Sequence, residues 1–378
     1  MHITIDRSHF LTAIQSVQKA ISTKTTIPIL TGIKLSVTEQ GLKMTATDLQ
    51  IGIETIVQKE QNGETILQIH QLGSIVLTAK YLGEIVRKLP QATVDIEVKQ
   101  NYLTIIRSGT SEFNLHGLDA EEFPRLPQVT GNQVFSIPSD LLKDMIRQTV
   151  YAVSTEEIRP VLTGVVWSLK EGNLKFVATD SHRLASRKVQ VEAPEEMQLF
   201  NIIVPGKSLL ELGRLLSEDD TLVDIVVADN QVLIHMGRTQ FYSRLLEGQY
   251  PDTTRIIPNT YKTAVQVKTK DLLDAVERAA LIAKDNDNNV VRFNIKQMII
   301  DITSNSPDVG KVSETLKPIQ VSGEDMIIAC NAKYLIEALR VITSPEITVE
   351  FTGSMSPILL KPLDNPGYLT LVLPVRIY

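Results

Sequence analysis

The chain has 378 residues, a formal net charge of −6 and a hydrophobic fraction of 43%. This length allows two or three domains, and the charged fraction of 22% is typical of a folded protein rather than a disordered one. Cys330 is the one cysteine, so a secreted scaffold held by internal disulfides is excluded. The acidic balance argues against nucleic acid as a partner, although a basic surface inside an acidic shell would give the same sum.

The first residues, MHITIDRSHF, do not have the basic segment followed by an apolar segment that marks a signal peptide. No stretch of 18 or more residues is free of charge, so no membrane-spanning helix is expected. These two features favour a cytoplasmic protein.

The first third of the chain predicts a helix, then strands, then a second helix and further strands. The helices have apolar residues at helical spacing, and the strands alternate apolar and polar residues. In chain order the segments are SHFLTAIQSVQKA (8–20), TIPILTGIKLSV (26–37), LKMTATDLQIGIET (42–55), LTAKYLGEIVRKLP (77–90), ATVDIEVK (92–99) and the turn LDAEEFPRLP (118–127).

The same series returns twice, and the third copy is the most diverged, near residues 289–314. The second copy reads SDLLKDMIRQTV (139–150), IRPVLTGVVWSL (158–169), LKFVATDSHRLASR (174–187), VPGKSLLELGRLLS (204–217), LVDIVVAD (222–229) and LEGQYPDTTRIIP (246–258). The third reads KDLLDAVERAALIA (270–283), NVVRFNIKQMII (289–300), IDITSNSPDVGKVSE (300–314), CNAKYLIEALRVIT (330–343), EITVEFTG (346–353) and YLTLVLPVRIY (368–378). A series that recurs at a fixed period indicates an internal structural repeat.

The late helix of each copy carries one pattern, repeated about 127 residues apart. A Lys is followed four residues later by Glu and seven residues later by Arg, in Lys80/Glu84/Arg87, Lys207/Glu211/Arg214 and Lys333/Glu337/Arg340. Apolar residues follow the Lys at two, five and nine positions, in Leu82/Ile85/Leu89, Leu209/Leu212/Leu216 and Leu335/Ala338/Ile342. Each helix therefore predicts one buried stripe and one cationic edge.

These elements predict an α+β fold of three repeated domains, each an antiparallel sheet with two helices. The domain limits are expected in proline-containing connectors, giving residues 1–128, 129–253 and 254–378.

Two local motifs could suggest catalysis. NIIVPGKSLLEL (201–212) has Gly-Lys-Ser before a helix, but Asn201 stands where a phosphate loop needs glycine, so a helix start at Pro205/Gly206 is expected. TDSHRLA (179–185) has adjacent Asp, Ser and His, whereas adjacent strand residues point to opposite faces and a catalytic triad is assembled in space. A turn or a recognition surface is favoured, and an α+β hydrolase is kept as an alternative.

No metal or cofactor site is expected. The six histidines are scattered at His2, His9, His70, His116, His182 and His235, and the cysteine has no second cysteine to join it. A GxGxxG fingerprint and a catalytic pair of carboxylates are also missing from the sequence.

The helix count suggests what a cationic surface could enclose. Six helices side by side would ring a bore of only about 10 Å, whereas twelve helices from two chains would leave about 28 Å. The larger bore admits a hydrated DNA duplex, so a head-to-tail dimer closed into a ring is favoured. Cations facing the bore would contact phosphates without reading bases, and such contacts allow sliding.

Five segments, in this order along the chain, give it a family resemblance: TIPIL (26–30), RPVLTG (159–164), ATDSHRLA (178–185), YPDTTRIIP (250–258) and LPVR (373–376). The chain resembles the bacterial DNA polymerase III beta subunit family, the sliding clamps, over essentially its whole length. The resemblance implies a non-catalytic processivity factor, a ring-shaped homodimer around duplex DNA. It also implies, as partners, the DNA polymerase III alpha subunit, an ATP-using clamp loader and other replication and repair proteins. A non-catalytic protein-interaction scaffold without DNA is the alternative.

The resemblance also implies site residues. The partner-peptide pocket would comprise Leu162, Thr179, His182, Arg183, Leu184, Pro251, Arg255, Ile256, Leu373, Pro374, Val375 and Arg376. DNA would be contacted by Lys24, Lys80, Arg159 and Lys207. The dimer interface would join Phe113 and Leu115 of the first domain to Leu281 and Ile282 of the third domain of the other chain.

Overall fold

The computed structural model describes residues 1–22, 25–127, 133–283 and 289–376, which fall into two compact units. Unit 1 comprises Met1–Asp140 with Leu210–Leu245, and unit 2 comprises Leu141–Leu209 with Leu246–Tyr378. Among the described residues, no helix has the length and apolar character that crossing a membrane requires.

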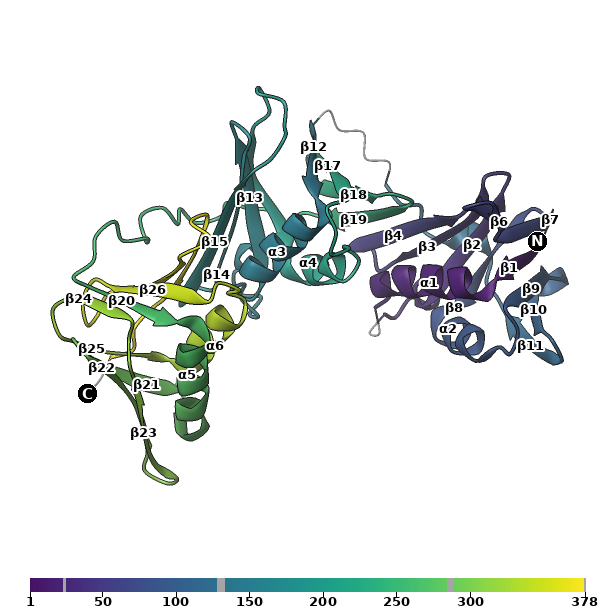
Figure 1. The fold of residues 1–378 in the computed structure, drawn as a ribbon. Coiled ribbons are helices and arrows are strands. Elements are labelled where there is room, and N and C mark those ends of the chain that lie inside the picture. Colours follow the sequence, from purple (N-terminus) through teal and green to yellow (C-terminus); the bar gives the residue numbers. More distant parts are fainter. Residues whose placement is uncertain (23–24, 128–132, 284–288, 377–378) are drawn as a thin grey trace. The chain divides into compact units, whose positions relative to one another are not determined.

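The predicted series of elements is present three times (Figure 1). The first copy contains β1 (His2–Asp6), α1 (Arg7–Val17), η1 (Gln18–Ala20), η2 (Pro28–Thr31), β2 (Gly32–Thr38), β3 (Gly41–Thr47), β4 (Ile51–Val57), β5 (Glu60–Gln61), β6 (Glu64–Thr65), β7 (Leu67–Gln71), β8 (Gly73–Thr78), α2 (Ala79–Lys88), β9 (Thr93–Val98), η3 (Gln100–Tyr102), β10 (Leu103–Ser108), β11 (Ser111–His116) and η4 (Ala120–Glu122). The second contains β12 (Gln133–Pro138), α3 (Ser139–Val150), η5 (Pro160–Thr163), β13 (Gly164–Lys170), β14 (Asn173–Thr179), β15 (Arg183–Gln190), β16 (Leu199–Pro205), α4 (Gly206–Gly213), β17 (Leu222–Ala228), β18 (Gln231–Met236) and β19 (Thr239–Arg244). The third contains β20 (Thr263–Lys268), α5 (Thr269–Ala283), β21 (Val290–Lys296), β22 (Ile299–Ser306), β23 (Gly310–Leu316), β24 (Gln320–Gly323), β25 (Met326–Asn331), α6 (Ala332–Arg340), β26 (Glu346–Phe351), β27 (Ile358–Pro362) and β28 (Tyr368–Val372).

One predicted strand differs in the same way in the first two copies. The segments TIPILTGIKLSV and IRPVLTGVVWSL each begin with a 3-10 turn, η2 or η5, before the strand starts. Pro28 and Pro160 open these turns, where a residue without an N–H leaves no helix bond unmade. Thr31 and Thr163 close them by donating their hydroxyls to the proline carbonyls at 2.8 and 2.7 Å.

Each copy supplies two four-stranded antiparallel layers with the same internal order. The layers are β4-β3-β2-β8 and β11-β10-β9-β1 in the first copy, β15-β14-β13-β16 and β19-β18-β17-β12 in the second, and β23-β22-β21-β25 and β28-β27-β26-β20 in the third. The first copy adds β7 beside β1, and the third adds β24 beside β20.

Sheets continue from one copy into the next. In unit 1, β19 pairs with β4 and makes an eight-stranded sheet; in unit 2, β28 pairs with β15 and makes a nine-stranded sheet. Because both junctions are hydrogen-bonded sheets, the second copy is divided between the two compact units. In the described sheets, β11 and β23 remain edge strands. By position in their copies, β11 corresponds to β19 and β28, and β23 corresponds to β4 and β15.

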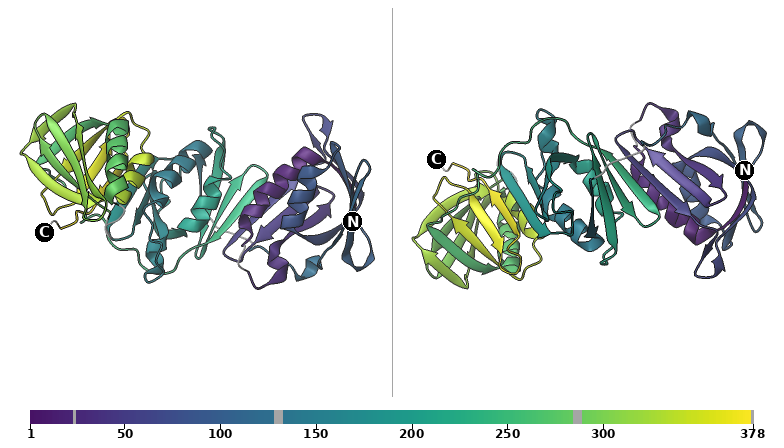
Figure 2. Two further views of the ribbon diagram at one scale, coloured as in Figure 1. Left: turned by 90° about the horizontal axis from the view of Figure 1, so that it is seen from below. Right: turned by 90° about the horizontal axis from the view of Figure 1, so that it is seen from above.

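The early helix of each copy packs on its sheets through an apolar stripe. In α1 the buried residues are Phe10, Ala13, Ile14 and Val17, and Figure 2 shows this helix, in purple, along the strands of the first copy. Asp6 caps the helix by accepting the backbone N–H of His9 at 2.9 Å, which satisfies one of the free donors of the first turn.

Candidate functional site

The late helices have the predicted buried stripe and exposed cationic edge. Leu82, Leu209 and Leu335 are at most 3% exposed, while the lysines and arginines of the pattern are exposed in all three helices. Each edge is therefore available to an anionic partner.

The glutamates of this pattern differ in what they contact. Glu211 accepts Arg214 Nη1, one residue beyond the end of α4, at 2.6 Å, whereas Glu337 accepts Arg183 from β15. Glu84 is exposed. Among the described ion pairs, none joins a lysine of the pattern to the glutamate four residues later. These glutamates therefore do not occupy the lysine ammonium groups.

The TDSHR segment forms a hydrogen-bonded turn between β14 and β15. Thr179 Oγ1 donates to the Arg183 carbonyl at 2.6 Å, and Asp180 Oδ1 accepts the backbone N–H groups of His182 and Arg183 at 2.8 and 3.0 Å. Ser181 has a φ of 79°. The first copy has the same turn, in which Thr47 and Asp48 make the matching bonds.

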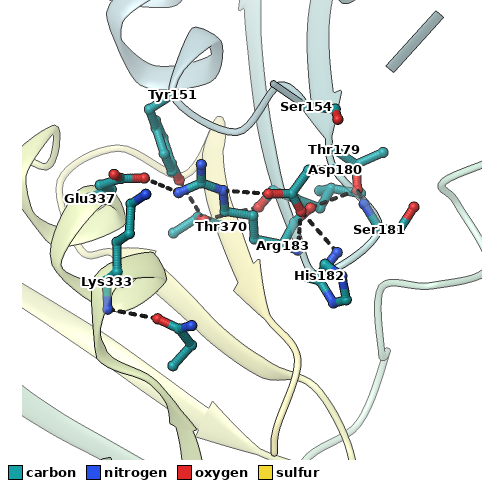
Figure 3. A network of polar contacts seen from close by, with 12 residues as sticks. Tyr151, Ser154, Thr179, Asp180, Ser181, His182, Arg183, Lys333, Glu337 and Thr370 are labelled. Atoms are coloured by element: carbon teal, nitrogen blue, oxygen red, sulfur yellow. Dashed lines mark hydrogen bonds and ion pairs between the residues drawn. The ribbon is translucent and has the colours of Figure 1, made fainter. Parts of the chain in front are cut away.

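This turn is not a catalytic triad. Asp180 is occupied by the turn backbone and by Arg183 Nε at 3.0 Å, so it does not orient the imidazole of His182. Ser181 and His182 point away from each other in Figure 3. The hydrolase interpretation of the sequence therefore has no geometric support, and His182, which is exposed, is free to meet a ligand.

A groove of about 620 Å³ lies in unit 2 beside this turn, lined by Arg159, Val161, Leu162, Gln249, Tyr250, Pro251 and Asp252. Its apolar floor is formed by Leu162 and Tyr250, which are buried in one cluster with Ile203. The hydroxyl of Tyr250 accepts the backbone N–H of Thr179 at 2.9 Å, and burial raises the pKa of Tyr250. The groove therefore has fixed apolar walls and polar groups at its mouth, as peptide and ligand sites do.

A second apolar cluster continues from this floor. Val177, Leu184, Leu359 and Leu371 are buried, and Val166, Ile257, Leu369 and Leu373 pack against them. Val166 also packs against the groove cluster, so the two apolar surfaces are continuous.

The end of the chain is anchored at this second cluster. Leu373 donates its backbone N–H to the His182 carbonyl at 2.9 Å, and Val375 donates to the Ala329 carbonyl at 2.8 Å. Pro374 lies opposite Cys330 in a β-bridge, and Arg376 is exposed. The LPVR segment thus borders the turn that carries His182.

Arg183 is buried at the centre of a polar network (Figure 3) and does not line the groove. Its side chain is 8% exposed and pairs with Asp180 and Glu337. The guanidinium also lies 4.7 Å from the Tyr334 ring centre and 5.5 Å from that of Tyr151. It therefore ties the TDSHR turn of the second copy to α6 of the third.

Two tyrosines extend this network. Tyr151 shares hydrogen bonds with Thr370 at 2.6 Å and with Tyr368 at 3.3 Å. Burial raises the pKa of both tyrosines.

The structure brings together most of the predicted pocket residues. Leu162 and Pro251 line the groove, Thr179 bonds to its tyrosine, and Leu184 and Leu373 belong to the adjoining cluster. Arg255 and Ile256 are exposed on the segment that follows the groove, and Arg255 Nε lies 3.6 Å from Asp252.

Four groove residues were not predicted: Val161, Gln249, Tyr250 and Asp252. Val161 lies within the RPVLTG motif, and Tyr250 and Asp252 lie within YPDTTRIIP. These three residues could therefore have been predicted from the motifs. Gln249 directly precedes the second motif.

The residues predicted to contact DNA are exposed where they are described. Lys80 and Lys207 lie in the first turns of α2 and α4, and Arg159 lines the groove. Lys24 lies outside the described residues.

The predicted dimer residues lie near free strand edges. Phe113, 39% exposed, and the half-buried Leu115 are on the edge strand β11. Leu281, 66% exposed, and the half-buried Ile282 are on α5, which packs against β22 and β23.

Family models match nearly the whole chain in three consecutive parts. Residues 1–127 match the N-terminal domain of the DNA polymerase III beta subunit, residues 136–252 its central domain, and residues 254–376 its C-terminal domain.

Named relatives agree along the full length. The beta sliding clamp of Bacillus subtilis (strain 168) is 48% identical over 379 residues, covering 100% of both chains. That of Halalkalibacterium halodurans is 46% identical over 382 residues, again covering 100% of both. The crystal structure of the DNA polymerase sliding clamp from Bacillus subtilis matches with a TM-score of 0.97 at 48% identity over 100% of both chains. The clamp of Pseudomonas aeruginosa bound to griselimycin matches with a TM-score of 0.92 at 29% identity, also over 100% of both.

Proposed function

Because this chain belongs to the DNA polymerase III beta subunit family, the sliding clamps, we propose that two copies join head to tail into a ring around duplex DNA. The chain is a processivity factor of DNA replication and not an enzyme. Its proposed partners are DNA, the polymerase III alpha subunit, the clamp loader and other clamp-binding proteins, and it would act in the cytoplasm. Its three domains would be residues 1–128, 129–253 and 254–378.

The observation that carries the ring is the way the copies join. The last strand of one copy pairs with the fourth strand of the copy before it, as β19 with β4 and β28 with β15. A second chain can repeat this step by pairing its β11 with β23, since both strands are free edges in the described sheets. Head-to-tail pairing of two chains uses both edges of each chain and closes the assembly.

The two junctions within the chain also suggest the register of this pairing. The first residue of the fourth strand, Ile51 in β4 and Arg183 in β15, lies opposite Ser243 and Val372 respectively. Gly310 is the first residue of β23. Leu115 in the β10–β11 hairpin and Ser243 in the β18–β19 hairpin occupy equivalent positions. Gly310 would therefore lie opposite the partner's Leu115.

The same register places Phe113 opposite Val312. At the internal junctions the equivalent pairs are Phe241 with Ile53 and Thr370 with Ala185, and all four of those residues are 0% exposed. Phe113 is 39% exposed in the single chain, so burying this remainder in the dimer would contribute about 1 kcal/mol per interface.

A charge exchange tests this interface. The wild-type chain should sediment near twice its 42.1 kDa mass, and Phe113→Lys should sediment as a monomer because it buries a charge at each interface. Adding Val312→Glu in the same chain should restore the dimer by placing a carboxylate opposite the lysine. A monomeric wild type, or a double variant no better than the single one, would contradict the proposed pairing.

The groove and its adjoining cluster are the proposed docking site for partner segments. Leu162 and Tyr250 supply the apolar floor, and His182 and Arg376 supply exposed polar groups. The rest of the proposed set is Thr179, Arg183, Leu184, Pro251, Arg255, Ile256, Leu373, Pro374 and Val375. Arg183 acts within this set as a positioning residue, because its guanidinium is held by carboxylates behind the turn.

The exposed cations of the late helices are the proposed DNA-facing surface, with Lys80, Lys207, Arg159 and Lys24 as contacts. Phosphate contacts by lysine carry no base preference, which suits a ring that must slide. Association with DNA by the closed ring should weaken as salt rises. Salt-independent binding, or none, would favour a protein-interaction scaffold without DNA.

A further inference from the structure

Three neighbouring strands of unit 1 bring two histidines and a carboxylate into one group. His2 is on β1, His70 on β7 and Asp95 on β9, and the strands lie in the order β9-β1-β7 within one sheet. Figure 1 shows β1, β7 and β9 together beside the point marked N. The histidines are distant in sequence, so their scatter along the chain hid a cluster that sheet pairing creates.

The group is held by direct contacts. His2 Nε2 lies 2.8 Å from Asp95 Oδ2, and the rings of His2 and His70 have centres 4.5 Å apart. Thr4 Oγ1 lies 2.9 Å from His70 Nε2 and 3.3 Å from Asp95 Oδ2. One ligand atom from each of His2, His70 and Asp95 lies within 4.8 Å of the others.

We propose that His2, His70 and Asp95 form a binding site for a divalent transition-metal ion, with Zn²⁺ the best match. Two imidazole nitrogens and one carboxylate oxygen are a donor set that Zn²⁺ takes, with water completing a tetrahedron. Bonds of 2.0–2.1 Å put neighbouring ligand atoms about 3.3 Å apart in that geometry. The ligand atoms lie within 4.8 Å of one another, so the most distant pair has to close by at most about 1.5 Å. His70 is exposed, so its ring has room to adjust about its contact with Thr4.

The surrounding charges leave the site open to a cation. Arg107 approaches Asp95 at Oδ1, at 3.5 Å, which leaves Oδ2 on the side of the histidine. The charge of Arg107 is offset by Glu97 at 3.1 Å and Glu112 at 2.9 Å, and Lys99 is paired with Glu97. Thr4 is placed to orient both His70 and Asp95, as groups that support metal ligands do.

A bound ion would fasten the first strand of the chain to both its neighbours. His2 and Asp95 are 93 residues apart in sequence, so the unfolded chain offers no preformed site. A ligand that binds the folded state alone raises its stability in proportion to the logarithm of its concentration. The site should therefore stabilise the sheet that ends in β11.

The test is calorimetric titration of ZnCl₂ into the full-length, chelator-treated chain with its own N-terminus and no histidine tag. The wild type should bind one equivalent per chain, and its melting temperature should rise with zinc concentration. His70→Gln and Asp95→Asn should each weaken zinc binding at least about tenfold. Loss of a residue that only supports a metal ligand already costs about this much, and these residues are ligands. His235→Gln, a half-buried histidine on β18 in the same unit, should bind as the wild type does.

MgCl₂ should produce no saturable heat, because Mg²⁺ prefers oxygen ligands. No saturable binding of zinc by the wild type would overturn the proposal. So would unchanged affinity in both His70→Gln and Asp95→Asn, or an equal loss in His235→Gln.

Discussion

Asp6 shows how one side chain can control a helix start. Burial raises the pKa of Asp6, but the hydrogen bonds from Ser8 and from the backbone and ring of His9 outweigh it and lower the pKa to about 2, against an ordinary value of 3.8. A carboxyl whose pKa is lowered by folding stabilises the fold above its unfolded pKa, and this contribution disappears as pH falls toward the folded value.

Asp6→Ala should therefore lower the free energy of unfolding by about 1 kcal/mol at neutral pH, the usual worth of an N-cap. The difference from wild type should shrink between pH 3.8 and pH 2, as followed by denaturant unfolding. Asp6→Asn keeps a capping oxygen and should show a smaller loss at neutral pH, and this loss should also shrink over the same range, because it is the wild-type carboxylate that titrates. A constant difference for Asp6→Ala across this range would refute the assignment.

Arg183 is the residue on which the junction between the second and third copies depends. Arg183→Ala should destabilise the chain by about 3 kcal/mol in denaturant unfolding, because Asp180 and Glu337 lose their cation in a poorly solvated place. Arg183→Lys should recover part of this loss, since it keeps the charge without the planar fork. Arg255→Ala, whose side chain is 90% exposed, is the control and should change stability little.

At the level of elements, the helices were the best predicted part. Apolar spacing of 3.6 residues placed the six α-helices of the described residues, and burial of Leu82, Leu209 and Leu335 confirms the predicted stripe. The role of Glu337 could not be predicted, because its partner Arg183 is 154 residues away. The 3-10 turns at Pro28 and Pro160 were missed because a short alternating run does not reveal where a strand begins.

The pocket was only partly predictable. The motifs could be identified in the sequence. The groove itself could not, because it forms where Leu162 and Ile203 of the second copy pack against Tyr250, which follows β19. The same limit applied to His2 and His70, which become neighbours only through the pairing of β1 with β7. Long-range pairing of this kind leaves no local pattern.

The terminal segment gives a prediction about docking. Removing Leu373–Tyr378 should abolish binding of a polymerase-derived peptide, because Leu373 packs on the apolar cluster beside His182. The dimer should persist, since β11 and β23 are untouched. Fluorescence anisotropy of a labelled peptide measures the first result and sedimentation the second.

His182→Ala is a gentler variant at the same place because His182 is exposed. The substitution should weaken binding of the peptide without affecting folding. Gln50→Ala changes the equivalent position of the first copy's turn and should leave peptide affinity unaltered. Equal affinity in the truncated chain and the wild type would rule out docking at this site.

The helix edges give a prediction about salt. Lys207→Ala should weaken association of the loaded ring with DNA. It should also reduce the slope of log affinity against log salt by about 0.9 for each phosphate that the protein no longer neutralises. Lys170→Ala, an exposed lysine at the end of β13, should leave the slope as it is. An unchanged slope in Lys207→Ala would mean that this edge does not face phosphates.

At the scale of the whole molecule, one joining step explains the architecture. The chain uses it twice, at β4 with β19 and at β15 with β28, and a dimer would use it twice more. The number of copies could be predicted from the sequence, whereas the identity of the joining strands required the pairings themselves.

The most direct test of the ring is topological. The protein is loaded by its clamp loader and ATP onto nicked circular DNA, and DNA-bound protein is separated by gel filtration before and after one cut in the circle. A ring that encircles the duplex should stay with the closed circle and leave the linear molecule by sliding off its ends. Equal retention on the circle and on the cut DNA would contradict encirclement.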